Sequence, residues 1–149
     1  MLLAIAFSLA LVVATSLIHY EGLRWVSRGL AAWTAVPGRR KVLIGILCIF
    51  AIHIVEITLY AFAYWYADIV VDIGGFAGAH EAGTFEYFYF SAESFTTLGL
   101  GDIYPVGPLR LLASIESING LLLIGWSTSY TFYGMQRHWL LDEGAGDRT

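Results

Sequence analysis

Three long apolar stretches, separated by shorter polar segments, restrict the fold of this 149-residue chain more than any other feature. They cover about residues 2–18, 42–66 and 109–133. A helix needs roughly 20 mostly apolar residues to cross the hydrocarbon core of a bilayer, and these stretches meet that requirement. The sequence therefore predicts an all-α membrane protein with three transmembrane helices.

The composition agrees with burial in lipid. The chain is 58% hydrophobic and only 13% charged, and its mean hydropathy is +0.68, which is too apolar for an ordinary soluble domain. A net charge of -4 provides no basic patch of the kind that nucleic-acid binding requires. Cys48 is the only cysteine, so one chain can build neither a disulfide framework nor a thiolate metal site.

Residues 1–40 are predicted to form an N-terminal transmembrane helix and a basic connection. No basic residue precedes the first apolar stretch and no clear small-x-small cleavage site precedes His19, as they would in a secretory signal, so we expect this helix to be retained. The helix is expected to continue as an amphipathic surface helix through EGLRWVSRGLAAW, before Pro37 and Gly38 break the chain. We expect the first helix to pack outside the second, with His19 at the membrane interface.

The distribution of charge predicts the orientation of the chain in the membrane. The acidic segment at residues 67–108 holds six carboxylates and no Lys or Arg. The connection between the first two stretches holds a single acid and the basic residues Arg24, Arg28, Arg39, Arg40 and Lys41. Because basic loops stay in the cytoplasm, we expect the N-terminus outside and the C-terminus inside. Arg39, Arg40 and Lys41 are also candidates for binding anionic lipid.

A short polar segment, SFTTLGLGDIYP at residues 94–105, lies between the second and third apolar stretches. An exposed, glycine-rich loop is expected at residues 72–84, and the sequence FEYFYFSAESFTT that follows predicts a helix of about ten residues, too short to cross a bilayer. Non-helical backbone at membrane depth is tolerated only when it is buried in protein or lines a water-filled cavity. The sequence thus predicts a re-entrant loop whose carbonyl groups bind a desolvated cation.

From about residue 41 to residue 136, the chain resembles the pore domain of potassium channels, with its outer helix, pore helix, filter and inner helix. The matching residues are Thr96, Thr97, Gly99, Gly101, Asp102, Tyr104 and Pro105. The resemblance implies a filter that binds K⁺ through carbonyl groups, formed by Thr97, Leu98, Gly99, Leu100 and Gly101. The family builds each filter from four such loops, so a homotetramer that conducts K⁺ passively is implied.

The residues of this segment suit such a filter. Gly99 and Gly101 adopt positive φ readily, whereas Leu98 and Leu100 would resist it, so alternating conformations can point successive carbonyls the same way. Thr97 adds a hydroxyl oxygen at the inner end. Leu100 replaces the tyrosine most common in the family, and we expect K⁺ selectivity to persist in a softer filter.

The resemblance also implies residues that support the filter and line the pore. Glu93 and Asp102 match a pair of carboxyls behind the filter, which are expected to share a proton because both are unlikely to ionise at close range. Thr96 belongs to the same support. Gly120 lies ten residues after Arg110, at the spacing of the hinge glycine of the family. The expected cavity-lining residues are Leu121, Ile124, Thr128 and Phe132.

Two other interpretations use the same sequence. GLGD also resembles the motif of GxGD-type intramembrane aspartyl proteases, in which this aspartate pairs with a second one on another span. None of the three predicted spans holds an aspartate, and the flanking Thr-Thr and Tyr-Pro favour the channel. A non-conducting or weakly selective channel-like subunit is the second alternative.

Ionisable residues within the predicted spans form a possible intramembrane polar cluster. His53 and Glu56 lie three residues apart on the outer helix, and Glu116 and Asn119 repeat this spacing on the inner helix. Such groups are functional candidates because they are costly at membrane depth. Their role is either proton-sensitive gating or interhelical hydrogen bonding. Metal binding is the least favoured role, since their spacing is not diagnostic.

Missing motifs narrow the mechanism. No span carries arginine at every third position, and no phosphate-binding glycine loop is present, so neither a voltage sensor nor ATP-driven transport is predicted. We expect no enzymatic activity and no cofactor other than permeating K⁺ at the filter. Residues 137–149 are expected to form a short cytoplasmic tail, and the expected location is the bacterial inner (cell) membrane.

Overall fold

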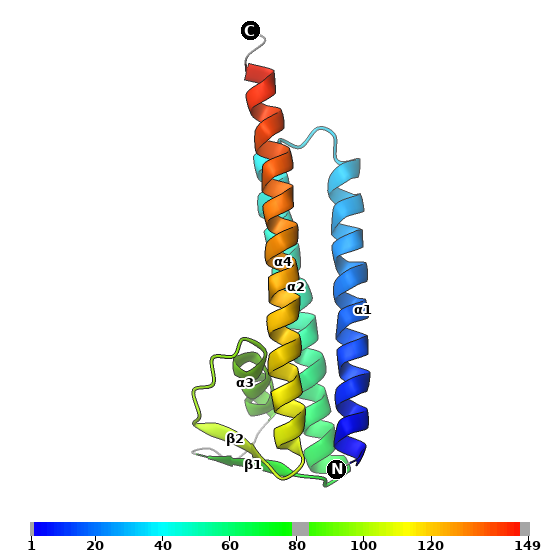
Figure 1. Cartoon of the computed structure of the whole chain (residues 1–149), viewed down its shortest axis with the longest axis vertical. Helices are drawn as coiled ribbons and strands as arrows, with labels where there is room; N and C mark the ends of the chain where they lie inside the picture. Colours follow the sequence, from blue (N-terminus) through cyan, green and yellow to red (C-terminus); the bar gives the residue numbers. More distant parts are fainter. Residues whose placement is uncertain (1, 79–83, 147–149) are drawn as a thin grey trace.

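The computed structural model describes residues 2–78 and 84–146, and three long helices running side by side dominate it (Figure 1). Between the second and third long helices lie a short helix and a two-stranded ribbon at one end of the molecule. The elements are α1 (Leu2–Ala32), α2 (Gly38–Trp65), the π-helical turn η1 (Tyr66–Val70), β1 (Gly75–Gly78), α3 (Thr84–Phe95), β2 (Ile103–Val106) and α4 (Leu109–Gly146).

The three long helices confirm the predicted number of spans. The segments Leu2–Ala32, Gly38–Val70 and Leu109–Arg137 are long and apolar enough to cross a membrane, as expected of an integral membrane protein. Helix α1 continues through the residues that were expected to form a surface helix, and the two parts form one unbroken helix. At 1.5 Å per residue, its 31 residues extend about 46 Å, which exceeds the roughly 30 Å hydrocarbon core.

The break between α1 and α2 lies where the sequence predicts it. Helix α1 ends at Ala32, and Pro37 caps α2 with φ of -57° and ψ of 146°. The Pro37 carbonyl accepts a hydrogen bond from the backbone N–H of Arg40 at 3.0 Å. Proline suits a helix start because its fixed φ is compatible with the helix and its missing N–H would be unpaired there.

Helix α1 packs against both α2 and α4 rather than against the outer helix alone. Its buried residues recur every three or four positions and so form one stripe along the helix. They are Ala4, Ser8, Leu11, Thr15, His19 and Leu23. His19, which was predicted to lie at the membrane interface, belongs to this stripe, and its side chain is 0% exposed. Close packing continues at Gly22, where an added Cβ would lie 2.6 Å from Ile52 Cδ1.

Aromatic rings form the core where α2, α3 and β1 meet. The ring of Phe76 packs edge-on against Phe90 at a centroid separation of 4.8 Å, and against Tyr64 and Tyr87 at 5.5 Å. The hydroxyl of Tyr87 donates to Asp68 Oδ2 at 2.7 Å. Burial, reinforced by this carboxylate, raises the pKa of the Tyr87 phenol, so it stays a donor at neutral pH. These contacts fix α3 against the end of α2.

The predicted glycine-rich loop is partly wrong, because residues 75–78 form the strand β1. This strand pairs antiparallel with β2, in a register that places Gly75 opposite Val106 and Gly78 opposite Ile103. Gly78 has φ of +143°, and an added Cβ would collide with the carbonyl oxygen of Asp102. The backbone pairing thus requires glycine at this position. Residues 79–83 of the predicted loop lie outside the described residues.

Candidate functional site

The segment that follows α3 has an alternating backbone conformation. Gly99 and Gly101 have φ of +56° and +79°, as their sequence positions predict, and Thr97 also has a positive φ of +59°. The sequence did not indicate Thr97, because a β-branched residue rarely adopts this conformation. Three positive-φ residues thus alternate with Leu98 and Leu100 across residues 97–101.

This segment lies open on the surface of the single chain. Residues 96–102 are all exposed, and the side chains of Leu98 and Leu100 are 64% and 60% exposed. No atom lies within 4 Å of the position that a Cβ would take at Gly99 or Gly101. The backbone here is therefore accessible to an ion or to another copy of the chain.

Glu93 ties the segment to α3. Its side chain is only 4% exposed, and Oε2 accepts a hydrogen bond from the Leu100 backbone N–H at 2.8 Å. Its backbone carbonyl accepts a second bond from the N–H of Leu98, also at 2.8 Å. Glu93, in the last turn of α3, thus accepts hydrogen bonds from the backbone of two loop residues, Leu98 and Leu100. The hydroxyl of Thr96 bonds back to the Ala92 carbonyl at 2.8 Å and makes no bond to the loop.

The expected proton-sharing pair of Glu93 and Asp102 does not form. The Asp102 carboxylate accepts from the hydroxyl of Tyr89 at 3.2 and 3.3 Å, and from the backbone N–H of Ile103 at 3.0 Å. Glu93 has Leu100 as its partner instead. Each carboxylate therefore has its own donor, which removes the reason for a shared proton.

Gly120 lies where the end of α3 crosses α4. A Cβ at this position would collide with the carbonyl oxygen of Phe95 and lie 2.9 Å from both its carbonyl carbon and its ring. Helix α4 continues through Gly120 without interruption. Close packing thus accounts for glycine here, whereas the sequence resemblance suggests a hinge.

The expected cavity residues lie on the outward side of α4. Leu121 and Phe132 are 61% and 60% exposed, Thr128 is exposed and Ile124 is half-buried. The Thr128 hydroxyl bonds to the Ile124 carbonyl at 2.9 Å. Within one chain, this face of α4 is available to line a space between copies.

The residues of the predicted polar cluster separate into two groups. On α4, the carboxylate of Glu116 accepts hydrogen bonds from the hydroxyl of Tyr64 and, at 2.6 Å, from that of Ser91. Asn119 donates to the hydroxyl oxygens of Thr15 at 2.8 Å and Tyr60 at 3.2 Å. These bonds connect α4 to α1, α2 and α3.

His19, His53, Glu56 and Ser127 form the second group, which we call the histidine ring. The Nδ1 atoms of His19 and His53 lie 2.9 and 2.8 Å from different oxygens of Glu56. The Nε2 atom of His53 lies 3.0 Å from Ser127 Oγ, and that of His19 lies 3.3 Å from it. The ring of four contacts joins α1, α2 and α4.

Sequence reasoning identified His53, Glu56, Glu116 and Asn119 but missed most of their partners. The recurrence of Ser8, Thr15 and His19 on the buried stripe of α1 was the signal that could have found two of them. Among the side chains that the structure describes, no buried nitrogen or oxygen lacks a hydrogen-bond partner. Interhelical contacts of this kind offset the cost of placing polar groups within the spans.

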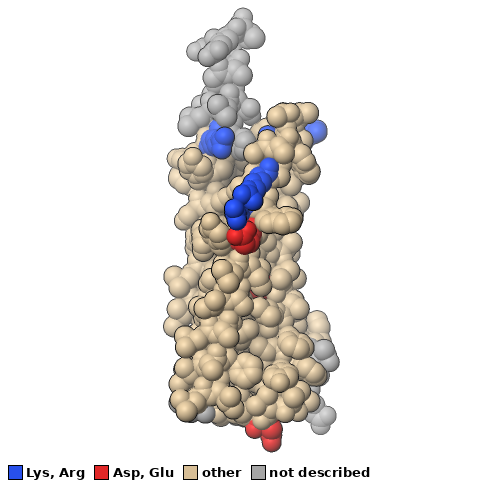
Figure 2. All heavy atoms as spheres, turned by 90° about the vertical axis from the view of Figure 1, so that its right-hand side faces the viewer, with Lys and Arg blue, Asp and Glu red and all other residues tan. Residues whose placement is uncertain are grey.

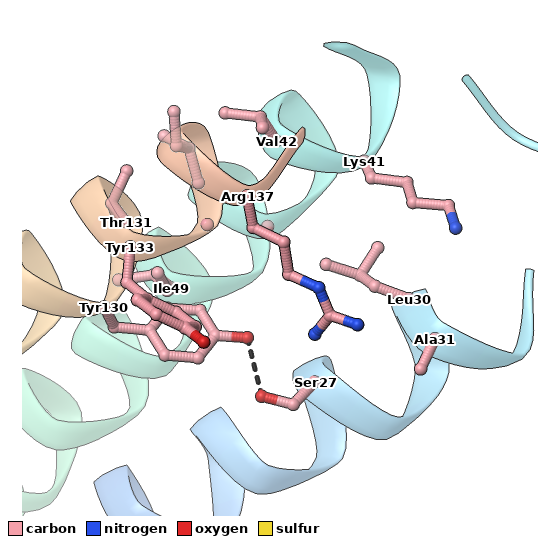
Figure 3. A pocket seen from close by; sticks show the side chains of 13 residues that line it. Ser27, Leu30, Ala31, Lys41, Val42, Ile49, Tyr130, Thr131, Tyr133 and Arg137 are labelled. Carbon is pink, nitrogen blue, oxygen red and sulfur yellow. Dashed lines mark hydrogen bonds between the residues drawn. The ribbon is translucent and has the colours of Figure 1, made fainter. Parts of the chain in front are cut away.

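A cavity of about 370 Å³ opens between α1, α2 and α4 near the basic end of the molecule (Figure 3). Its lining is mostly apolar, and a hydrogen bond of 2.7 Å between the hydroxyls of Ser27 and Tyr130 lies against it. Figure 3 shows the side chains of Lys41 from α2 and Arg137 from α4 at this space, facing Leu30 of α1. Neither Arg39 nor Arg40, which the sequence placed with Lys41, lines it.

The comparisons with known proteins bear directly on residues 43–136. This part of the chain, which is more than half of it, matches the family model described as "Ion channel". It contains α3, the positive-φ segment and most of α2 and α4. Neither the curated proteins nor the solved structures gave a match. The chain therefore belongs to this family of ion channels, whose unit is a potassium-channel-like pore domain with two transmembrane helices.

Proposed function

We propose that the protein is a passive K⁺-selective channel whose filter is formed by the backbone carbonyls of residues 97–101. The observation that carries this proposal is the alternation of positive φ at Thr97, Gly99 and Gly101, directly after a short helix and within the family match. Such alternation lets successive carbonyls face one side of the chain. Rings of carbonyls can replace the hydration shell of K⁺. In this arrangement α3 serves as a re-entrant pore helix.

A homotetramer follows from the same proposal, because a single loop offers carbonyls on one side of an ion only. The exposed Leu98 and Leu100 would gain cover from neighbouring copies. The outward face of α4 that carries Leu121, Thr128 and Phe132 would then line a central cavity below the filter. The proposed pore domain comprises residues 41–136. Residues 1–40 would add the N-terminal helix and its basic connection, and residues 137–149 would form the tail.

The proposed orientation places the basic end in the cytoplasm. On the face formed by α1, Lys and Arg side chains gather toward the end at which the C-terminus lies, and the surface below them carries few charges (Figure 2). Figure 1 shows the N-terminus at the opposite end, close to the ribbon. The positive-inside rule thus puts the N-terminus and the filter loop outside. The proposed location is the bacterial inner membrane.

We also propose that the cavity near the basic end binds an anionic lipid. Its apolar walls suit an acyl chain, and Lys41 and Arg137 supply two positive charges with no acidic residue in the lining. The sequence predicted a lipid site at Arg39, Arg40 and Lys41. The proposed site keeps Lys41 of these three residues and includes Arg137 as its second basic residue. A basic residue near an anionic membrane surface contributes roughly 1 kcal/mol.

Flux into liposomes tests the proposed channel activity. The protein is reconstituted, and Rb⁺ and Na⁺ uptake are measured for the wild type, Gly99→Ala and Gly29→Ala. We expect uptake of Rb⁺ well above that of Na⁺. Gly99→Ala should abolish it, because alanine at φ of +56° costs roughly 1–2 kcal/mol in each copy.

Gly29→Ala is the matched control, because Gly29 lies in helix α1, outside the proposed pore, and has no atom within 4 Å of a Cβ position. Equal Rb⁺ and Na⁺ uptake would refute selectivity. Tetramers without any flux would favour a non-conducting channel-like subunit. A Gly99→Ala variant that still passes Rb⁺ selectively would contradict the assignment of the filter.

A further inference from the structure

The geometry of the histidine ring points to a metal site that lies apart from the proposed filter. We propose that His19, His53 and Glu56 bind a divalent transition metal of the zinc type, which fastens α1 to α2. Their potential ligand atoms all lie within 4.8 Å of one another. Two histidines and one glutamate are an established donor set for Zn²⁺.

The arrangement offers four ligand atoms rather than three. Each Nδ1 faces a different oxygen of Glu56, at 2.9 Å for His19 and 2.8 Å for His53. Zinc bonds to nitrogen and oxygen are about 2.0–2.2 Å long, so neighbouring ligand atoms around one ion lie about 3 Å apart. An ion between the two nitrogens, chelated by both oxygens, would need only small shifts of the side chains.

Ser127 provides the outer support that such a site requires. Histidines that bind a metal usually donate their second ring N–H to a neighbouring acceptor, which fixes the tautomer. Both Nε2 atoms lie near Ser127 Oγ, at 3.0 Å for His53 and 3.3 Å for His19. A hydroxyl oxygen has two lone pairs, so Ser127 can accept from both histidines when each Nδ1 binds the metal.

Counting protons gives an independent reason for an additional cation. With Glu56 ionised and both histidines neutral, three protons are available for the four contacts of the ring: one on Ser127 and one on each imidazole. One contact would then join two acceptors. A metal ion in place of the two Nδ1 protons removes this conflict, because both Nε2 atoms then carry hydrogen. The competing occupant is a fourth proton, and the experiment below distinguishes the two.

The residues around the proposed site would enclose the ion within the protein, as expected of a structural metal site. His19 and Glu56 are 0% exposed, and within the described part of the chain no Lys or Arg side chain pairs with Glu56, whose partners are the two histidines. The rings of Trp126 and Phe95 pack against the imidazoles, with centroids 5.3 Å from His19 and 5.7 Å from His53. A buried carboxylate needs charge compensation, which the ion would provide. His19 lies outside the matched residues 43–136, so the site depends on the additional helix.

The test measures metal binding directly, without any ion flux. The full chain is purified in detergent without a histidine tag, treated with EDTA and titrated with Co²⁺. Its visible absorption reports coordination, and the Zn²⁺ content is measured after dialysis. We expect a single Zn²⁺ per chain, an absorption band typical of low-coordinate Co²⁺, and a higher unfolding temperature with Zn²⁺.

His19→Gln and Glu56→Gln should each abolish this band, whereas Ser127→Ala should weaken affinity about 10–100-fold. Cys48→Ser is the control, because it removes the free thiol and should change nothing. If the glutamine variants do not fold, the Co²⁺ titration and the Zn²⁺ content of the wild type alone test whether the site binds metal. A wild type that binds no stoichiometric metal, or binding that persists in His19→Gln, would overturn the proposal. A fourth proton, rather than a metal ion, would then complete the contacts of the histidine ring.

Discussion

Gly120 of α4 lies directly against the carbonyl group of Phe95, the last residue of α3, so closely that no side chain fits between them. This contact sets the distance between α4 and the helix that carries the proposed filter loop. It connects the backbone at the start of the loop to the helix proposed to line the pore.

Gly120→Ala should therefore destabilise the protein, because its Cβ would collide with backbone atoms rather than with a flexible side chain. Overpacking of this kind typically costs about 1–3 kcal/mol. Thermal unfolding in detergent, followed by tryptophan fluorescence, measures the loss. Gly125→Ala on the same helix is the control, since its Cβ meets no atom within 4 Å. A Gly120→Ala protein of unchanged stability but altered gating would instead support the hinge implied by the resemblance.

The spans could be predicted because lipid imposes the same requirement on every crossing helix. An apolar run of sufficient length is visible without any knowledge of tertiary contacts, and all three runs form helices. The packing of the second half of α1 could not be predicted in this way, since this part was expected on the membrane surface and is instead held by contacts with α2 and α4. The buried position of His19 likewise depends on Glu56, which lies 37 residues away.

In residues 97–102, the sequence predicted the backbone conformation where glycine permits positive φ. It did not predict which hydrogen-bond partners the nearby carboxylates have. Gly99 and Gly101 have the positive φ that their lack of a Cβ permits, whereas Thr97 adopts the same conformation despite its branched side chain. Spacing correctly placed Glu93 close to the loop. Spacing alone could not show that Glu93 accepts from the Leu100 N–H while Asp102 accepts from the Tyr89 hydroxyl. A shared proton or separate donors would both place the two carboxylates near residues 97–101.

Glu93→Ala should lower the selectivity of the proposed channel. Loss of the carboxylate removes the acceptor of the Leu100 N–H, and a hydrogen bond of this kind contributes about 0.5–1.5 kcal/mol. We expect the ratio of Rb⁺ to Na⁺ uptake to fall about tenfold, which corresponds to ~1.4 kcal/mol.

Glu93→Gln is the matched variant, because its amide oxygen can still accept from Leu100 and should preserve most of the ratio. Glu86→Gln, in the first turn of α3, controls for the loss of a charge. Wild-type selectivity in Glu93→Ala would show that the bond is dispensable.

Asp102→Asn separates the channel from the protease alternative. The amide oxygen of asparagine can still accept from the Tyr89 hydroxyl, which lies 3.2–3.3 Å from the Asp102 carboxylate oxygens. A channel should thus retain measurable Rb⁺ flux, whereas an aspartyl protease would lose all activity. Rb⁺ uptake and cleavage of a transmembrane peptide are measured on the same preparations. Peptide cleavage by the wild type that disappears in Asp102→Asn would favour the protease.

Lys41→Gln and Arg137→Gln should each weaken binding of phosphatidylglycerol, because both side chains lie at the cavity between α1, α2 and α4. The loss of about 1 kcal/mol per basic residue predicts an affinity about fivefold lower for each variant, measured by native mass spectrometry with phosphatidylcholine as the neutral lipid. Arg28→Gln is the control, since Arg28 is exposed on α1 and does not line the cavity. Glycerol phosphate should not compete, because the apolar walls contribute by holding an acyl chain. Equal losses in all three variants would indicate general attraction to an anionic surface rather than a site.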